Sequence, residues 1–440
     1  MHRCSRPAPS TPEPVTAAVV IAFFALALLA LPLAFALGLA ALGGMVAGGV
    51  EWQVLPQRMM HSVNSFPLLA IPCFMLAGEL MVEGGIMEKL VALANSVVGR
   101  VRGGLGHVTV VSAASLSAIS GTAVADATAL SSTLGPSLAK YYGNGFGAAI
   151  VAAAANLGPI IPPSAAMIVY AYMAGPSVSV GGLFMAGFVP GLLMAAAMML
   201  LITWIAKRRG YPHTGESFSL ANVLAQFRRS ILIVLMPLVV VGGIVGGAFT
   251  ATEGSAIAVV YALVVGLFVT KKLKWLDLPP AMFRAAITTG VVTILIAFAS
   301  AVTFLLSIDL IPQKLTAFLQ GITQDPTLFI WIVMAVLVVV GMFLESNAAY
   351  IMLVPLLAPI AELYGLDPLH FGFVFILNLV IGMLTPPVGV LLFVVSSARQ
   401  VPLNTLLANV WPFIVCQFAV LVLCIVYPPI VTWLPRQLGY

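Results

Sequence analysis

Residues 156–164 read Asn-Leu-Gly-Pro-Ile-Ile-Pro-Pro-Ser, and residues 378–389 read Asn-Leu-Val-Ile-Gly-Met-Leu-Thr-Pro-Pro-Val-Gly. The two Asn-Leu pairs lie 378 − 156 = 222 residues apart, and the Tyr-Gly pairs that begin at Tyr142 and Tyr364 keep this offset. The double prolines lie 386 − 162 = 224 residues apart, a slip of two residues. Both copies stand inside apolar sequence. Hydrophobic segments broken by Gly and Pro at matching places in two halves of a chain are typical of a transporter's binding site.

The composition predicts a protein that lies in a lipid bilayer. Of its 440 residues, 61% are hydrophobic and only 8% are charged, and the mean hydropathy is +1.12. Soluble domains carry about 25% charged residues, and a chain of this size has too little interior to bury so much apolar surface. The apolar runs are continuous over about 20 residues, whereas the strands of membrane barrels alternate. We therefore expect an all-α polytopic membrane protein.

Basic residues gather at the ends of the apolar runs. They are Lys207, Arg208, Arg209, Arg228, Arg229, Lys271, Lys272 and Lys274. Because Lys and Arg concentrate in cytoplasmic loops, we expect segment 207–229 to face the cytoplasm. The sequence has no basic stripe interleaved with aromatic residues, so we expect no nucleic-acid partner. The four cysteines form no Cys-x-x-Cys pair, which disfavours a metal site or a disulfide framework.

The apolar runs divide the chain into two halves. A polar tail (1–16) precedes the first half (17–206), and the basic linker (207–229) leads to the second half (230–440). We expect segment 86–102 to lie at the membrane interface or to link two spans, and residues 219–229 could form a short surface helix. We expect simple spans near 17–45, 63–83, 178–206, 231–249, 254–271, 281–308 and 407–433.

Four other segments carry Gly, Pro, Ser, Thr or a carboxylate at mid-length. We expect a re-entrant hairpin at 107–135 and a broken helix at 145–173 in the first half, with a second pair at 328–361 and 371–398. Irregular backbone at membrane depth is tolerated only where protein buries it or where it lines a polar cavity. This pattern predicts an inverted-repeat transporter fold in which the four segments surround one cavity.

The tip of the first hairpin is rich in small polar residues. Ser120, Gly121 and Thr122 suggest an unwound tip that offers oxygen ligands to a dehydrated cation, although packing by small residues is an alternative. Asp126 follows within the hairpin, and an ionisable group at membrane depth is usually functional. It could bind a cation, carry a proton, or accept hydrogen bonds that fix the hairpin.

A similar polar segment stands at the corresponding place in the second half. Glu345 precedes Pro386 by 386 − 345 = 41 residues, and Asp126 precedes Pro162 by 162 − 126 = 36. Gly341 and Asn347 flank Glu345, and we expect these residues at the tip of the second hairpin. A position of Glu345 in a terminal loop is the alternative.

The repeated double prolines predict two unwound stretches. Two prolines together remove amide donors and break a helix, and the glycines Gly158 and Gly382 upstream allow an irregular backbone. A simple kink would need one proline and no repeat. The side chains beside the breaks that could add oxygen ligands or contact a substrate are Asn156, Ser164, Asn378 and Thr385, followed by Gly389. Outside the breaks, His107 and His370 could move protons, and Arg399 could bind a carboxylate or extend to the interface.

Five sequence motifs in this chain resemble those of the large membrane subunit of tripartite ATP-independent periplasmic (TRAP) transporters. They are the stretches 65–72, 119–126, 158–164, 367–372 and 382–389, and the resemblance runs from about Leu31 to Leu434. It implies a sodium-coupled secondary importer that works by an elevator mechanism. By motif match the sodium ligands fall on Ser120, Gly121, Thr122, Asn156, Gly158, Gly341, Asn347, Gly382 and Thr385. Asp126, Ser164, Glu345, Asn378 and Gly389 would contact the substrate or support those ligands.

The resemblance also implies partners and a cellular location. A soluble periplasmic binding protein would deliver a small organic anion, a carboxylate or a sulfonate, to a multi-pass protein of the bacterial inner membrane. A small four-helix membrane subunit would associate as a separate chain. The coupling ions would be sodium, and no cofactor is expected. The alternative is a standalone symporter or antiporter without a binding protein. We expect no enzyme, because the sequence lacks His-Glu-x-x-His, Gly-x-Ser-x-Gly and Walker A motifs.

Overall fold

The computed structural model describes residues 14–29, 31–211 and 219–440. All regular elements in these ranges are helical, and eight helical segments are long and apolar enough to cross a membrane. The expected all-α polytopic class is thereby confirmed.

In chain order the α-helices are α1 (Pro14–Leu28), α2 (Leu33–Gly48), α3 (Val54–Val63), α4 (Ala70–Glu83), α5 (Ile86–Val98), α6 (Gly104–Ser120), α7 (Ala123–Thr133), α8 (Gly135–Tyr142), α9 (Asn144–Ala155), α10 (Ala165–Ala174), α11 (Val180–Arg209), α12 (Leu220–Val245), α13 (Ala251–Val264), α14 (Leu278–Ile308), α15 (Ile311–Ile322), α16 (Pro326–Phe343), α17 (Ser346–Leu363), α18 (Pro368–Gly382), α19 (Val390–Arg399), α20 (Leu403–Val426) and α21 (Pro429–Gln437). Short 3-10 turns lie at Phe66–Leu69 and Trp275–Asp277, and a π-helical turn lies at Val265–Thr270.

Two expectations from the sequence are corrected. The run 17–45 is not one span, because α1 ends at Leu28 and α2 begins at Leu33, directly after Pro32. A proline disfavours helical backbone in the residue before it, which explains the division. Residues 220–229 form no separate surface helix but the first part of the continuous helix α12. Part of the predicted linker, 212–218, lies outside the described residues.

Each half contains a helical hairpin followed by an interrupted helix. Helices α6 and α7 form hairpin 1, and α16 and α17 form hairpin 2. Break 1 (156–164) separates α9 from α10, and break 2 (383–389) separates α18 from α19. Both breaks contain a cis Pro-Pro peptide bond. The helices lie within a few residues of the predicted ranges.

The repeated Tyr-Gly pairs mark helix ends. Tyr142 is the last residue of α8, and Tyr364 follows the last residue of α17. The glycines after them have positive φ angles, 82° at Gly143 and 73° at Gly365. L-residues rarely adopt this backbone conformation, so glycine is suited to let the chain turn there into the interrupted helix.

The two interrupted helices enter the molecule from opposite ends. The first turn of α9 lies beside the start of α20, because a Cβ atom added at Gly145 would lie 2.7 Å from Asn409 Nδ2. The first turn of α18 lies at the end of α20, where His370 Nε2 is 2.9 Å from the carbonyl oxygen of Cys424. The start of α20 lies beside the end of α11, because Arg209 donates to Asn409. With its 24 residues, α20 separates the two entry points by about 36 Å.

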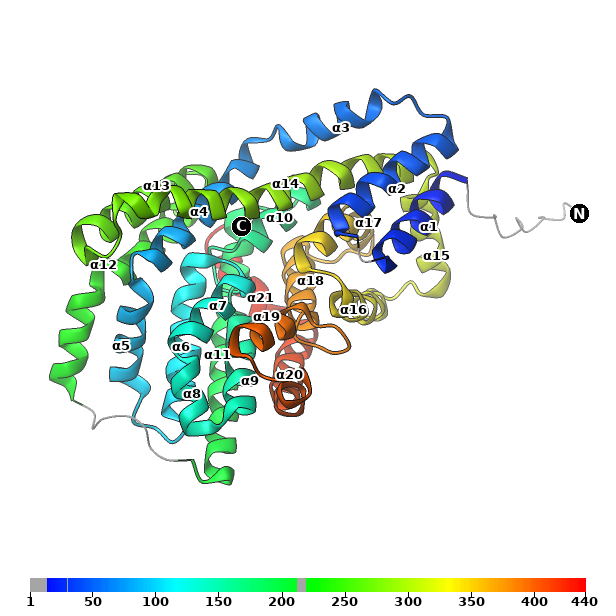
Figure 1. The fold of residues 1–440 in the computed structure, drawn as a ribbon. Coiled ribbons are helices and arrows are strands. Elements are labelled where there is room, and N and C mark those ends of the chain that lie inside the picture. The colour runs from blue at the N-terminus through cyan, green and yellow to red at the C-terminus, as the bar shows by residue number, and fades with distance from the viewer. Residues whose placement is uncertain (1–13, 30, 212–218) are drawn as a thin grey trace, which may run out of the picture.

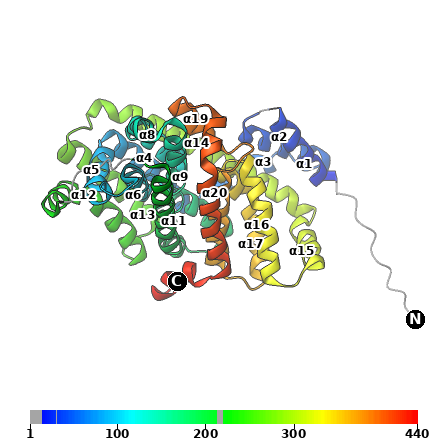
Figure 2. The ribbon, with the colours of Figure 1, turned by 90° about the horizontal axis from the view of Figure 1, so that it is seen from below.

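The most deeply buried segments are the first parts of the interrupted helices. All residues from Gly145 to Ala155 and from His370 to Gly382 are buried, as expected for helices that are apolar on every face. Helix α20 packs on α9, α11 and α18 (Figure 2). On the other side of the molecule, α14 packs along α2, α3 and α4 (Figure 1).

Candidate functional site

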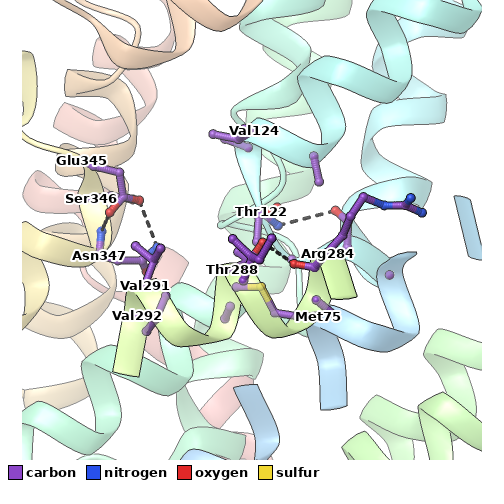
Figure 3. A pocket seen from close by; sticks show the side chains of 18 of the residues that line it. Met75, Thr122, Val124, Arg284, Thr288, Val291, Val292, Glu345, Ser346 and Asn347 are labelled. Atoms are coloured by element: carbon purple, nitrogen blue, oxygen red, sulfur yellow. Dashed lines mark hydrogen bonds between the residues drawn. The ribbon is translucent and has the colours of Figure 1, made fainter. Parts of the chain in front are cut away.

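A cavity of about 1000 Å³ is lined by the hairpin tips and by helices α2, α4 and α14. Hairpin 1 contributes residues from Ser120 to Ser132, and hairpin 2 contributes residues from Glu345 to Ala348. Both breaks reach the cavity, through Pro159 and Met383. Figure 3 shows α14 passing both tips, with Thr288 on the side of Thr122 and Val292 on the side of Asn347. The cavity thus brings together elements from both halves.

Asp126 joins the two arms of hairpin 1. Its side chain is completely buried, and its two carboxylate oxygens accept hydrogen bonds from Ser117 and Ser120 on α6. The Ser117 Oγ to Asp126 Oδ2 distance is 2.9 Å. A buried carboxylate needs such donors to offset the loss of hydration. Of the roles considered for Asp126, this geometry matches that of an acceptor that fixes the hairpin.

The tip of hairpin 1 rests directly on break 1. A Cβ atom added at Gly158 would lie 2.7 Å from the carbonyl carbon of Thr122, and one added at Gly121 would lie 2.9 Å from the carbonyl oxygen of Pro163. Gly121 also has a φ angle of 63°. Both glycines are therefore required by close backbone approach, and the structure brings Ser120, Gly121 and Thr122 against the break.

Break 1 exposes a main-chain oxygen. In a continuous helix the amide of residue 162 would bond the carbonyl of Gly158, but Pro162 has no amide hydrogen. The carbonyl oxygen of Gly158 accepts no hydrogen bond from any described residue. The oxygen of Pro159, in contrast, accepts a 2.7 Å bond from the Ser164 hydroxyl, which also caps α10. Ser164 therefore shapes the break, while the carbonyl oxygen of Gly158 is left without a donor among the described residues.

Glu345 organises the tip of hairpin 2. It is the N-cap of α17, and its Oε2 accepts from the backbone amides of Asn347 at 3.0 Å and Ala348 at 3.3 Å. Its Oε1 accepts from the side chains of Ser346 and Asn347. A carboxylate at a helix N-terminus is stabilised by these amides and by the helix dipole. Glu345 lies at the hairpin tip, as the first alternative predicted, and not in a terminal loop.

Hairpin 2 contacts break 2 through glycines and one backbone hydrogen bond. A Cβ atom added at Gly382 would lie 2.7 Å from Gly341 Cα. The amide of Gly389, at a φ angle of 60°, donates to the carbonyl oxygen of Met342 at 3.0 Å. Because that amide is used elsewhere, the carbonyl oxygen of Thr385 accepts no hydrogen bond from the described residues. The Thr385 hydroxyl donates to Ile381 within α18.

The two repeated asparagines face neighbouring helices. Asn156 Nδ2 donates to Gln417 Oε1 on α20 at 2.8 Å, and Asn378 Nδ2 donates to the carbonyl oxygen of Met334 on α16 at 2.8 Å. Both side chains are fully buried, and the Oδ1 atom of each has no hydrogen-bond partner among the described residues. Each amide therefore ties an interrupted helix to another helix and leaves one buried oxygen open for a ligand.

Three polar residues outside the predicted site have structural partners. His107 is hydrogen-bonded to Thr203, and His370 to the carbonyl oxygen of Cys424. Arg399 donates to the carbonyl oxygens of Ser131 and Gly135 at the end of α7 and the start of α8. These contacts anchor helix ends outside the cavity.

The sequence reasoning did not single out Gln417, Ser117 or Arg284. Gln417 and Arg284 are isolated polar residues within apolar runs, which is a signal of function or pairing at membrane depth. Arg284 on α14 lines the cavity and donates to Glu79 and Glu83 on α4. Ser117 was one serine among many, and only the helix phase shows that it faces Asp126.

The chain is similar to known membrane transport proteins over most of its length. The family model described as "Tripartite ATP-independent periplasmic transporter, DctM component" matches residues 20–430. The sialic acid TRAP transporter large permease protein SiaM of Vibrio cholerae is 36% identical over 387 residues, 87% of this chain and 90% of that protein. The C4-dicarboxylate TRAP transporter large permease protein DctM of Pseudomonas aeruginosa is 35% identical over 383 residues, 87% of this chain and 89% of that protein.

A solved structure shares the fold. The crystal structure of the YdaH transporter of Alcanivorax borkumensis matches with a TM-score of 0.60, covering 96% of this chain and 100% of that chain. The two sequences are 15% identical, so this likeness concerns the fold alone.

Proposed function

Because the chain belongs to the DctM component family of tripartite ATP-independent periplasmic transporters, we propose that it imports small organic acids in symport with sodium. The chain is an integral membrane protein and the large permease subunit of such a transporter; its relatives are transport proteins and not enzymes. The proposed substrates are carboxylates of the kind named for the relatives, sialic acid or C4-dicarboxylates. The proposed location is the bacterial inner membrane.

One observation supports the coupling to sodium more than any other. Each hairpin tip rests on a break whose main-chain oxygens, at Gly158 and Thr385, are left without donors. A dehydrated sodium ion needs such oxygens, and unwound helices in transporters supply them. The proposed ligands are contributed by the two tips and the two breaks: Ser120, Gly121, Thr122, Asn156, Gly158, Gly341, Asn347, Gly382 and Thr385.

The elevator mechanism is proposed on the basis of the packing. The two hairpins and the two interrupted helices pack together as one body, in which each hairpin tip touches the break of its own half. Helices α2, α4 and α14 face this body across the cavity. We propose that the hairpins are re-entrant, that the two halves are inverted repeats, and that the body moves against α14 and its neighbours.

Two partners belong to the proposal. A periplasmic binding protein delivers the acid, and a small four-helix membrane subunit associates with the permease. The experiment is uptake of radiolabelled succinate and sialic acid into proteoliposomes that contain both membrane subunits. Uptake is expected to require a sodium gradient and the loaded binding protein. Equal uptake with potassium would contradict the coupling, and uptake by this chain alone would favour the standalone symporter or antiporter.

A further inference from the structure

The cavity contains one cationic side chain. Among the described residues that line it, Arg284 is the only Lys, Arg or His. Four carboxylates line it as well, but Asp126 and Glu345 are held by donors within their own hairpins. An anion that enters the cavity therefore has a single guanidinium available to balance its charge.

Arg284 is held by one edge only. Its Nε donates to Glu79 Oε2 at 2.8 Å, and its Nη2 donates to Glu83 Oε1 at 2.6 Å. Glu79 and Glu83 lie one turn apart on α4, so both reach the guanidinium from the same helix. Nη1 donates to no atom in the part of the chain that the structure describes.

These ion pairs are only partly covered by the protein, so the guanidinium can be reached from the cavity. The side-chain exposure is 43% for Arg284, 30% for Glu79 and 40% for Glu83. Ion pairs in contact with water contribute little to stability, because water replaces the lost contact. A carboxylate that binds in the plane of the guanidinium needs Nη1 and Nη2 together. Each of these two nitrogens has a hydrogen on the edge that the glutamates leave free, so an acid can bind there while Glu79 and Glu83 keep the other edge.

Arg284 lies on the hairpin 1 side of the cavity. On α14 it precedes Thr288 by one turn, and Figure 3 shows both residues on the side of Thr122, with Val291 and Val292 beside Asn347. An anion bound at Arg284 would therefore lie on the side of the cavity that hairpin 1 lines.

We propose that Arg284 binds the acid group of the transported anion inside the cavity through its free Nη1 and Nη2 edge, and that the negative charge of Glu83 competes with the anion for the guanidinium. The inference rests on the proposed function and names the group that recognises the substrate class. Glu83 partly neutralises the guanidinium, so its charge lowers the affinity of Arg284 for the acid.

The alternative is that the cluster only fastens α14 to α4, and the two roles predict different signs. If the cluster only connects α14 to α4, replacing Arg284 or Glu83 removes the same ion pair. Both variants should then change the Kd for the anion in the same way. As a binding site with a competitor, R284Q should weaken anion binding and E83Q should strengthen it.

The experiment measures equilibrium binding of radiolabelled succinate and sialic acid to the two-subunit complex in lipid nanodiscs, with sodium and without the binding protein. We expect R284Q to raise the Kd roughly tenfold or more, as for the loss of charge-assisted hydrogen bonds. We expect E83Q to lower the Kd a few-fold, as for the removal of a weak surface pair. R436Q is the matched control, because Arg436 pairs with Asp367 at 3.0 Å and does not line the cavity.

An unchanged Kd in R284Q, or a rise of the Kd in both R284Q and E83Q, would overturn the proposal. A wild-type complex that imports an acid but does not bind it in nanodiscs would also do so. If R284Q does not assemble, R284K is used, which keeps the charge without the planar fork and should still raise the Kd. A wild type that imports neither acid contradicts the proposed function instead.

Discussion

The guanidinium of Arg399 donates a hydrogen bond to the carbonyl oxygen of Gly135 over 2.7 Å. Arg399 ends α19 in the second half, and Gly135 begins α8 in the first half. A second bond reaches Ser131 at 3.4 Å. The side chain that the sequence offered as a carboxylate ligand therefore connects the two halves behind hairpin 1.

Replacing Arg399 by Ala should destabilise the protein. The two carbonyl oxygens lose a charged donor, which corresponds to about 1–3 kcal/mol. The thermal unfolding midpoint of the purified protein in detergent measures the effect. R436A is the control, since its exposed pair with Asp367 contributes about 0–1 kcal/mol. Equal unfolding midpoints for R399A and R436A would show that the hydrogen bonds of Arg399 to Ser131 and Gly135 do not stabilise the protein.

Replacing Gly382 by Ala should separate hairpin 2 from break 2. The new methyl group would lie 2.7 Å from Gly341 Cα, a contact that backbone atoms cannot relieve without a shift. Overpacking of this kind costs about 1–3 kcal/mol, and it should abolish most sodium-dependent uptake while the protein still inserts. G242A on α12 is the control, because nothing lies within 4 Å of its added Cβ. Normal uptake by G382A would show that the glycine contact is dispensable.

The pair Asn156 and Gln417 should behave as one unit. Replacing either by Leu leaves the other amide buried without its partner, at a cost of about 1–3 kcal/mol. Replacing both should restore part of that loss, since no unpaired amide of the pair remains. A double-mutant cycle on thermal unfolding tests this coupling. Strictly additive losses would mean that the two amides do not stabilise each other.

Replacing Thr385 by Val should weaken the dependence on sodium. Val keeps the shape and removes the hydroxyl oxygen, so the sodium concentration for half-maximal uptake should rise, roughly threefold to tenfold for a ligand worth about 1 kcal/mol. T109V is the control: the Thr109 hydroxyl makes a similar bond four residues back, at 2.8 Å, on the buried face of α6. An unchanged sodium requirement in T385V removes Thr385 from the proposed site.

The repeated Gly and Pro pattern predicted the hairpins and breaks because its effects are local. A double proline breaks a helix whatever packs around it, and the observed breaks fall where Pro162 and Pro386 stand. The partners of the two asparagines could not be predicted from the neighbouring sequence, because they lie on other helices. Helix α9 ends just before Asn156, whereas α18 continues four residues beyond Asn378 to Gly382.

The side-chain partners in the site could not be predicted, because they depend on which way each helix faces and on residues far away in the sequence. The two asparagines share the 222-residue offset but not their partners, which are a side chain on α20 for Asn156 and a main-chain oxygen on α16 for Asn378. The slip of two residues accompanies the different lengths of the breaks. Arg284 pairs with residues that precede it by about 200 positions, and no local pattern indicates such a pairing. The same holds for Gln417, whose partner Asn156 lies 261 residues away.

The contacts of α20 have a consequence for how the chain is built. The helix belongs to the second half, yet it packs on α9 and α11 of the first half, and Gln417 bonds to Asn156 and to the carbonyl oxygen of Ala153. The two halves follow one another in sequence but are interlocked in space. Neither can complete its interior during synthesis until the last spanning helix arrives, so the first half must wait in the membrane with part of its core uncovered.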